Sequence, residues 1–236
     1  MDRRTYLGTV GIAGLTSVAG CLDGVLGSEE SGNPDTVLEP PETDLSDASH
    51  PSYGDEFPAV SVPDPFSGET ISTDQFEGER AMLMTFVYTN CPDGMCPALT
   101  LRLRRAQEVA ADEGYGDEAA FLEMTFDPER DTEDAIRSFA DQQGVDLDAE
   151  NWHFLRPESY DEAKEIVDGT YGLPLKKCHR GDECYTDEYE ELEYMFPHFT
   201  HIFLVNKQGI VERVYSNGAS MEISRLIDDF ETVVTA

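Results

Sequence analysis

The most constraining feature of this 236-residue chain is a pair of cysteines that directly follows an apolar run. Residues 80–88 read RAMLMTFVY, the pattern of a strand buried on both faces. Cys91 and Cys96 come next, and residues 97–113 begin with proline and carry apolar residues at helical spacing. The sequence therefore predicts two thiols at the point where a buried strand leads into the N-terminus of a helix.

That position indicates a redox or metal site. The unpaired amides and the dipole of a helix N-terminus favour a thiolate, so we expect a lowered cysteine pKa. An inert disulfide is the alternative, although inert pairs are seldom placed at such a terminus. If both cysteines were helical, five steps would set them about 140° apart around the helix. We therefore expect Cys91 and Gly94 in the loop, with Gly94 at positive φ.

The rest of the chain alternates between strand and helix patterns. We expect a second buried strand and three further helices, at residues 119–126, 133–143, 160–170 and 221–234. Residues 202–205 and 210–215 flank the turn Asn206-Lys207-Gln208-Gly209 and form a hairpin. This order predicts an α/β sandwich with a mixed central sheet flanked by helices, spanning residues 56–236.

The first 21 residues have the features of an export signal. A twin arginine, Arg3 and Arg4, precedes an apolar stretch too short for a bilayer span, which takes about 20 residues. The start resembles a twin-arginine signal, and Val18-Ala19-Gly20-Cys21 resembles a lipobox, whose cysteine becomes lipidated. We expect a signal peptide over residues 1–21 and attachment at the extracytoplasmic side of the cell membrane, through a lipid on Cys21 only. An ordinary secretory leader or a short N-terminal anchor is the alternative.

Acidic residues dominate the chain. There are 49 Asp and Glu against 16 Lys and Arg, a net charge of −33, which argues against nucleic acid or an anionic lipid surface as the main ligand because both would be repelled. The acid is spread over every segment, which indicates a halophilic surface, with a mesophilic acidic protein as the alternative. Residues 22–55 are acidic, rich in Gly, Ser and Pro and without apolar period, so we expect a flexible linker there.

Three motifs together resemble the Sco/SenC family. They are Tyr88-Thr89-Asn90-Cys91-Pro92-Asp93, Cys96 followed by Pro97, and Asp127-Pro128-Glu129-Arg130-Asp131-Thr132 after the second strand. The resemblance runs from about Phe57 to the C-terminus and implies a thioredoxin-like fold. It also implies copper held by both cysteines and one distal histidine. Two thiolates and an imidazole suit Cu(I), with Cu(II) as a further possibility.

The distal histidine is identified from the family spacing. In the family it lies eight residues before the residue that opens the hairpin turn, which here gives His198. His201 is the alternative, but in an extended strand it faces the opposite way. We expect His50 and His153 to be satisfied surface or core residues. The chain departs from the family in having four residues between the cysteines instead of three, and Pro197 where an aspartate is usual.

A further departure is an acidic insertion at residues 176–195, which carries a second pair of cysteines. Without Cys21, the chain has two close cysteine pairs, which suits an oxidising compartment. We expect a disulfide between Cys178 and Cys184, with a metal site as the alternative, in an insertion that contributes nothing to the core. For the motif at residues 127–132 we expect a cap and loop brace, with Asp131 or Thr132 capping the following helix.

The resemblance implies a metallochaperone that delivers copper to the dinuclear copper centre of a terminal cytochrome oxidase. Its partner would be the copper-receiving subunit of cytochrome c oxidase. The alternative is an enzyme, a thiol-disulfide oxidoreductase that reduces partner cysteines through Cys91 and Cys96. A distal imidazole separates the two, because copper carriage needs it and a reductase does not. Peroxide reduction is a weaker hypothesis, since the sequence identifies no arginine for it.

Overall fold

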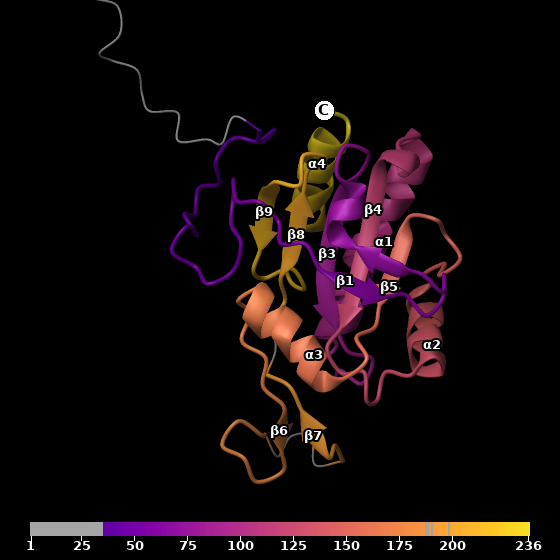
Figure 1. The fold of residues 1–236 in the computed structure, drawn as a ribbon, viewed down its shortest axis with the longest axis vertical. Helices are drawn as coiled ribbons and strands as arrows, with labels where there is room; N and C mark the ends of the chain where they lie inside the picture. Colours follow the sequence, from indigo (N-terminus) through magenta and orange to yellow (C-terminus); the bar gives the residue numbers. More distant parts are fainter. Residues whose placement is uncertain (1–34, 187–188, 190, 198) are drawn as a thin grey trace, which may run out of the picture. The chain divides into compact units, whose positions relative to one another are not determined.

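The computed structural model describes residues 35–186, 189, 191–197 and 199–236. The predicted signal peptide with Cys21, the first part of the predicted linker, and His198 lie outside the described residues. A five-stranded mixed sheet forms the centre of the folded part, with strand order β5-β4-β3-β8-β9 (Figure 1). The predicted fold class, a thioredoxin-like α/β sandwich, is confirmed.

Strand β3 (Ala81–Val87) lies in the middle of the sheet and is buried along its whole length. On one side it pairs in parallel with β4 (Ala119–Thr125), which pairs in parallel with β5 (Trp152–Leu155). On the other side it pairs antiparallel with β8 (Ile202–Val205), and β8 forms the expected hairpin with β9 (Val211–Tyr215). The β3–β4 register brings the ends of the two strands, and the motifs that follow them, to one edge of the sheet.

Helices cover both faces of the sheet. Helices α1 (Met95–Glu113) and α4 (Ile223–Val234) pack together on one face, where Phe230 of α4 lies 5.6 Å, ring centre to ring centre, from Phe121 of β4. Helix α2 (Glu133–Gln143) packs beside α1. Helix α3 (Tyr160–Lys164) continues as the π-helix η3 (Glu165–Thr170). The following Tyr171 contacts Phe86 on the opposite face.

Short elements complete the fold. Strands β1 (Ser61–Pro63) and β2 (Thr70–Ser72) form a small hairpin, followed by the 3-10 helix η1 (Thr73–Phe76). A further 3-10 helix, η2 (Gly116–Glu118), leads into β4. The sequence patterns predicted neither this hairpin nor β5, whereas the longer strands and all the longer helices lie where they were expected.

Residues 35–54, from the second part of the expected linker, make specific contacts with the folded domain. The amides of Val37 and Leu38 donate to the carboxylate of Glu212, at 2.7 and 3.0 Å. Further along, the Ser49 hydroxyl donates to the carbonyl of Gly172 at 2.7 Å. The segment is thereby attached both to β9 and to the end of η3.

The insertion at residues 176–195 contains strands β6 (Cys178–His179) and β7 (Tyr194–Met195) and the expected disulfide between Cys178 and Cys184. The prediction that it contributes nothing to the core is wrong. Tyr194 and Met195 are buried, and β7 leads directly into the fully buried Phe196. The aromatic end of the insertion therefore anchors it to the domain, while the acidic residues of the insertion that the structure describes are exposed: Asp182, Glu183, Glu191 and Glu193.

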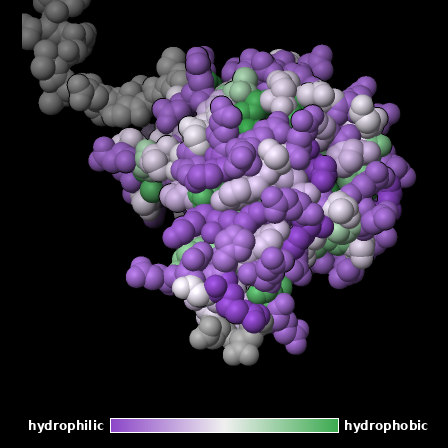
Figure 2. All heavy atoms as spheres, turned by 60° about the horizontal axis from the view of Figure 1, so that its bottom comes forward, coloured by the Kyte–Doolittle hydropathy of each residue, from purple (hydrophilic) through white to green (hydrophobic). Residues whose placement is uncertain are grey.

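The surface is strongly hydrophilic. Figure 2 shows one face on which hydrophobic residues form only small, separate spots. The large hydrophobic residues that are exposed in the described part of the chain are Val37, Met95, Leu101 and Ile223. Over the same residues, no helix has the length and apolar character needed to cross a membrane.

Candidate metal site at the cysteine pair

The cysteine pair lies in the connection between β3 and α1. Cys91 follows the end of β3 in a turn, and Cys96 is the second residue of the helix. Between them, Gly94 caps the helix in the left-handed region at φ +77°, as the extra residue in this loop led us to expect. Pro97 occupies the first turn, where its missing N–H leaves no hydrogen bond unmade.

Hydrogen bonds hold both sulfur atoms. The amide of Cys96 donates to Cys91 Sγ at 3.3 Å, and the amide of Tyr88 donates to Cys96 Sγ at 3.4 Å. The Cys91 thiol in turn donates to Asp93 Oδ1 at 3.1 Å, and this oxygen also accepts from the Met95 amide. Asp93 therefore connects the thiol of Cys91 to the start of the helix.

Cys96 is protonated in the metal-free protein. Its side chain is 1% exposed, and burial raises the pKa of the thiol well above its usual value. The adjacent Cys91 raises this pKa further, while the Tyr88 amide offsets part of the rise. The expectation that the helix N-terminus lowers the pKa is therefore wrong for Cys96, because desolvation outweighs the helix dipole. A metal ion that binds here has to displace this proton.

Asp131 stabilises the loop between β3 and α1. This carboxylate is fully buried and accepts hydrogen bonds from the amide and the hydroxyl of Thr89, at 3.1 and 2.6 Å, and from the hydroxyl of Thr125 at the end of β4. Burial raises the pKa of Asp131 to about 6, although these hydrogen bonds lower it in part. Its neighbour Thr132 caps α2 by accepting from the Ala135 amide. As predicted, this motif both braces the loop and caps the helix: Asp131 is the brace and Thr132 is the cap.

A cluster of aromatic side chains lies beside the thiols. Tyr88 packs against Phe126 and Phe196, with ring centres 5.1 and 5.3 Å apart. Burial, and then the charges of the two cysteines, raise the pKa of Tyr88. Arg130 lies 3.8 Å from the ring centre of Tyr194 and 5.8 Å from that of Tyr88. The insertion, through Tyr194, and the motif after β4, through Arg130, therefore both contribute to the surroundings of the cysteines.

The histidines occupy different places. His198 lies outside the described residues, so its position relative to the thiols is not part of the structure. His201 lies against Phe203 and Phe199, on the sheet face opposite α1. Among the described residues, no group of three or more His, Cys, Asp or Glu side chains is arranged to hold a metal ion. The two sulfur atoms fit a soft metal ion, and a third ligand has to come from elsewhere.

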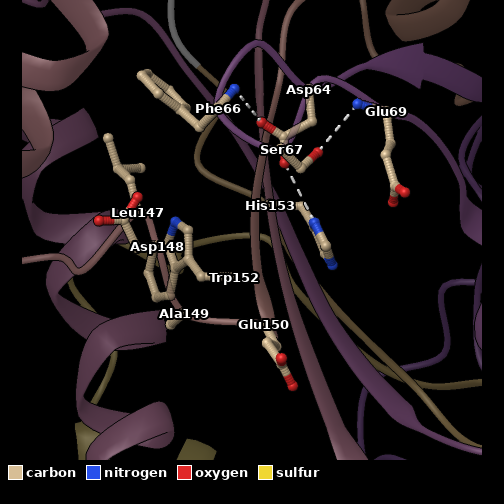
Figure 3. Close-up of a pocket in the computed structure, with 10 residues that line it drawn as sticks. All are labelled: Asp64, Phe66, Ser67, Glu69, Leu147, Asp148, Ala149, Glu150, Trp152 and His153. Atoms are coloured by element: carbon tan, nitrogen blue, oxygen red, sulfur yellow. Dashed lines mark hydrogen bonds and ion pairs between the residues drawn. The ribbon is translucent and has the colours of Figure 1, made fainter.

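His153 belongs to a different region. Its Nδ1 lies 3.2 Å from Asp64 Oδ2 in a cavity of about 310 Å³ at the start of β5 (Figure 3). Trp152, which lines this cavity, is the strand partner of Phe121. This part of β4 is remote from the cysteines, so the cavity is separate from the cysteine pair. His153 is thus satisfied by Asp64, as expected.

Sequence reasoning missed several residues that shape the site. Asp93 could have been found, because a carboxylate two residues after a cysteine is within hydrogen-bonding reach of its thiol. Tyr88 belonged to the motif but received no role. Nothing local indicated Phe196, because it reaches the site only through the path of the insertion.

A mixed sheet with two cysteines between its central strand and a covering helix defines a thioredoxin-like dithiol protein. The sequence matches the SCO1/SenC family model over residues 51–235. The chain therefore belongs to the SCO1/SenC family. No curated protein matches the sequence.

Solved structures share the fold. A SCO1/SenC family lipoprotein from Bacillus anthracis is 19% identical, with a TM-score of 0.58 over 75% of this chain and 94% of that one. Copper-bound ScoI from Arabidopsis thaliana is 18% identical, with a TM-score of 0.57 over 77% and 100% of the two chains. BsSco, a member of the Sco family of cytochrome c oxidase assembly proteins with an identified disulfide switch, is 22% identical, with a TM-score of 0.56 over 76% and 94%.

Proposed function

We propose that this protein is a copper carrier that binds copper through Cys91, Cys96 and His198 and delivers it to the dinuclear copper centre of a terminal cytochrome oxidase. The observation that carries the proposal is the pair of sulfur atoms held by backbone amides at the start of α1. Two thiolates and one imidazole form a soft set of low coordination number, which suits Cu(I). Family membership and the copper-bound Arabidopsis relative support the choice of metal.

Cu(I) titration of the reduced full chain tests the site. We expect one Cu(I) per chain, loss of tight binding in Cys91→Ser and in Cys96→Ser, and binding at least tenfold weaker in His198→Ala. His201→Ala serves as the matched histidine control and should leave Cu(I) binding unchanged. If His201 proves necessary and His198 does not, the ligand assignment is wrong. If neither histidine matters while reduction of a disulfide substrate depends on both cysteines, the protein is a thiol-disulfide oxidoreductase.

We further propose that the mature protein is tethered to the extracytoplasmic side of the cell membrane through a lipid on Cys21. The lipobox-like sequence carries this proposal, and the Bacillus anthracis relative is itself a lipoprotein. In a cell fractionation experiment, Cys21→Ser should release the protein from the membrane or block its maturation. Unchanged membrane association of that variant, with the leader cleaved at another residue, would refute the lipid anchor.

A further inference from the structure

A second pair of metal-binding side chains lies apart from the cysteines. His50, from the segment before the first strand, and His201, just before β8, are in edge-to-face contact, with ring centres 5.0 Å apart and ring planes at 63°. The two residues are 151 positions apart in sequence, so the fold alone brings them together. The sequence predicted His50 to be a satisfied surface or core residue, and His201 was considered only as a ligand beside the cysteines.

The distance between the rings matches a shared metal ion. A ligating imidazole nitrogen lies about 2.0–2.1 Å from a metal ion, which puts the ring centre roughly 3.2 Å from it. Two imidazoles on one ion therefore have ring centres about 5.2 Å apart at tetrahedral angles, and about 4.5 Å apart in cis positions of the tetragonal geometry that Cu(II) prefers. The observed separation of 5.0 Å lies between these two values.

His201 has a free nitrogen in a neutral ring. Its Nδ1 is buried without a hydrogen-bond partner, a costly arrangement for a polar atom. Burial, and then the charge of His50, lower the pKa of His201 to about 4, so the ring is neutral at pH 7. A neutral imidazole is the form that ligates metals. On His50, Nδ1 lies 2.9 Å from the carbonyl of Pro51, which leaves Nε2 for another ligand.

The surrounding residues hold the two rings in place. Phe203 stacks against His201 and packs edge-on against His50. The backbone next to His50 lies so close to Gly172 that a Cβ at this glycine would stand 1.9 Å from the carbonyl oxygen of Ser49. Gly172 therefore permits the approach that brings His50 to His201.

We propose that His50 and His201 form a second metal site, separate from the cysteine pair, that binds a divalent late-transition ion with Cu(II) preferred over Zn(II). Imidazole is a common ligand of both ions, and Cu(II) binds a given nitrogen site more tightly. No third His, Cys, Asp or Glu among the described residues completes a group with this pair, so water would have to enter with the ion and supply the remaining ligands. The inference goes beyond the proposed function, since Cu(I) carriage by the thiols does not require it.

The test uses the full chain with Cys91→Ser and Cys96→Ser, titrated with Cu(II) chloride and followed by calorimetry and electron paramagnetic resonance. We expect one Cu(II) per chain with coupling to two nitrogens, and at least tenfold weaker binding in His50→Phe and in His201→Phe. Phenylalanine suits the aromatic surroundings and lacks a ligand. His179→Ala, an exposed histidine of β6, is the matched control and should bind as before.

Two further measurements decide the outcome. Cu(II) should raise the melting temperature of the Cys→Ser chain, because it ties residue 50 to residue 201, and this rise should disappear in His50→Phe. Gly172→Ala should weaken Cu(II) binding although both imidazoles remain. Undiminished binding in His50→Phe, or a loss that follows His198→Ala instead, would overturn the proposal. Cu(I) titration of His50→Phe with its thiols intact reports on the proposed function separately.

Discussion

The backbone amide of Cys96 donates a hydrogen bond to the sulfur of Cys91, with 3.3 Å between the two atoms. One of the first amides of α1, which has no partner within the helix, is thereby satisfied by the other cysteine of the site. The contact requires the chain to turn sharply between the two residues, and Gly94 makes that turn at φ +77°. The left-handed conformation of Gly94 therefore allows four residues, instead of three, to lie between the two cysteines.

Gly94→Ala should separate the thiols. No heavy atom lies within 4 Å of the position a Cβ would take, so the cost is backbone strain, about 1 kcal/mol of unfolding free energy. If the loop relaxes to avoid the strain, the Cys96–Cys91 contact is lost, and Cu(I) affinity should fall at least tenfold. Denaturant unfolding and Cu(I) competition titration measure the two effects.

Gly68→Ala is the matched control for this prediction. Gly68 lies in the turn between β1 and β2 at φ +72°, with the same open surroundings. It should cost a similar free energy of unfolding and leave Cu(I) binding unchanged. Equal loss of Cu(I) affinity in the two variants would show that general destabilisation, and not the geometry of the cysteine loop, is responsible.

The sequence predicted those elements whose own residues settle their structure. Strand β3 is a continuous apolar run, α1 carries a helical apolar stripe, and α2 has a Thr132 cap and a Gly144 stop. The β8–β9 hairpin followed from its turn residues. In each of these elements the local sequence pattern agrees with the burial in the fold, so a short window of sequence is sufficient to predict the element.

Other features depended on contacts between distant residues. Strand β5 is only four residues long and is recognisable as a strand through its pairing with β4. The pKa of Cys96 depends on how completely the fold covers it, which the helix position alone does not reveal. Likewise, the contact between His50 and His201 joins a segment without any apolar period to the edge of β8.

Asp131→Asn should destabilise both the fold and the cysteine loop. The carboxylate accepts from the amide and hydroxyl of Thr89 and from Thr125, whereas an asparagine turns an N–H₂ group towards one of these donors. Loss of such a buried hydrogen bond costs about 1–3 kcal/mol. Thermal unfolding should show this loss, and Thr89→Val in the Asp131→Asn background should add less than Thr89→Val alone. Fully additive effects would contradict the brace.

Cys178→Ser with Cys184→Ser should loosen the insertion and leave the cysteine pair of the candidate site intact. The disulfide closes a short loop, for which chain entropy predicts a contribution of about 2 kcal/mol. Because Tyr194 still anchors the insertion to the domain core, we expect faster proteolysis after Arg180 and unchanged Cu(I) stoichiometry. A loss of Cu(I) binding would instead assign this second cysteine pair to the metal site.

Glu123→Gln should remove a pH dependence of stability. Burial under α1 raises the pKa of Glu123 to about 8. The nearby Thr100 hydroxyl offsets only part of this rise, because neither carboxylate oxygen of Glu123 has a hydrogen-bond partner of normal geometry. Above pH 4.5 the unfolded chain loses this proton while the folded chain keeps it, so stability falls as pH rises, until about pH 8. The contribution is up to about 1.4 kcal/mol per pH unit.

The measurement for Glu123 is the free energy of unfolding between pH 6.5 and 8. The pKa of Asp131, about 6 in the folded chain, and that of His201, about 4 when folded and about 6.5 when unfolded, affect the lower end of this window, but equally in the parent and in both variants. The parent should lose stability across it, and Glu123→Gln should lose clearly less. Glu133→Gln, which alters an exposed carboxylate paired with Arg137, should keep the slope of the parent. Equal slopes in all three proteins would contradict the raised pKa.

The acidic surface should make stability depend on salt. A net charge of −33 causes self-repulsion in the folded state, and the Debye length shortens from about 10 Å at 0.1 M to about 3 Å at 1 M. The melting temperature should therefore rise between 0.1 and 1 M potassium chloride.

Asp112→Lys with Glu113→Lys changes the net charge from −33 to −29 and places cations at the C-terminus of α1, where the helix dipole favours them. This variant should be stabilised most at 0.1 M and gain less from added salt, whereas salt-independent melting of the parent would refute a salt-adapted surface.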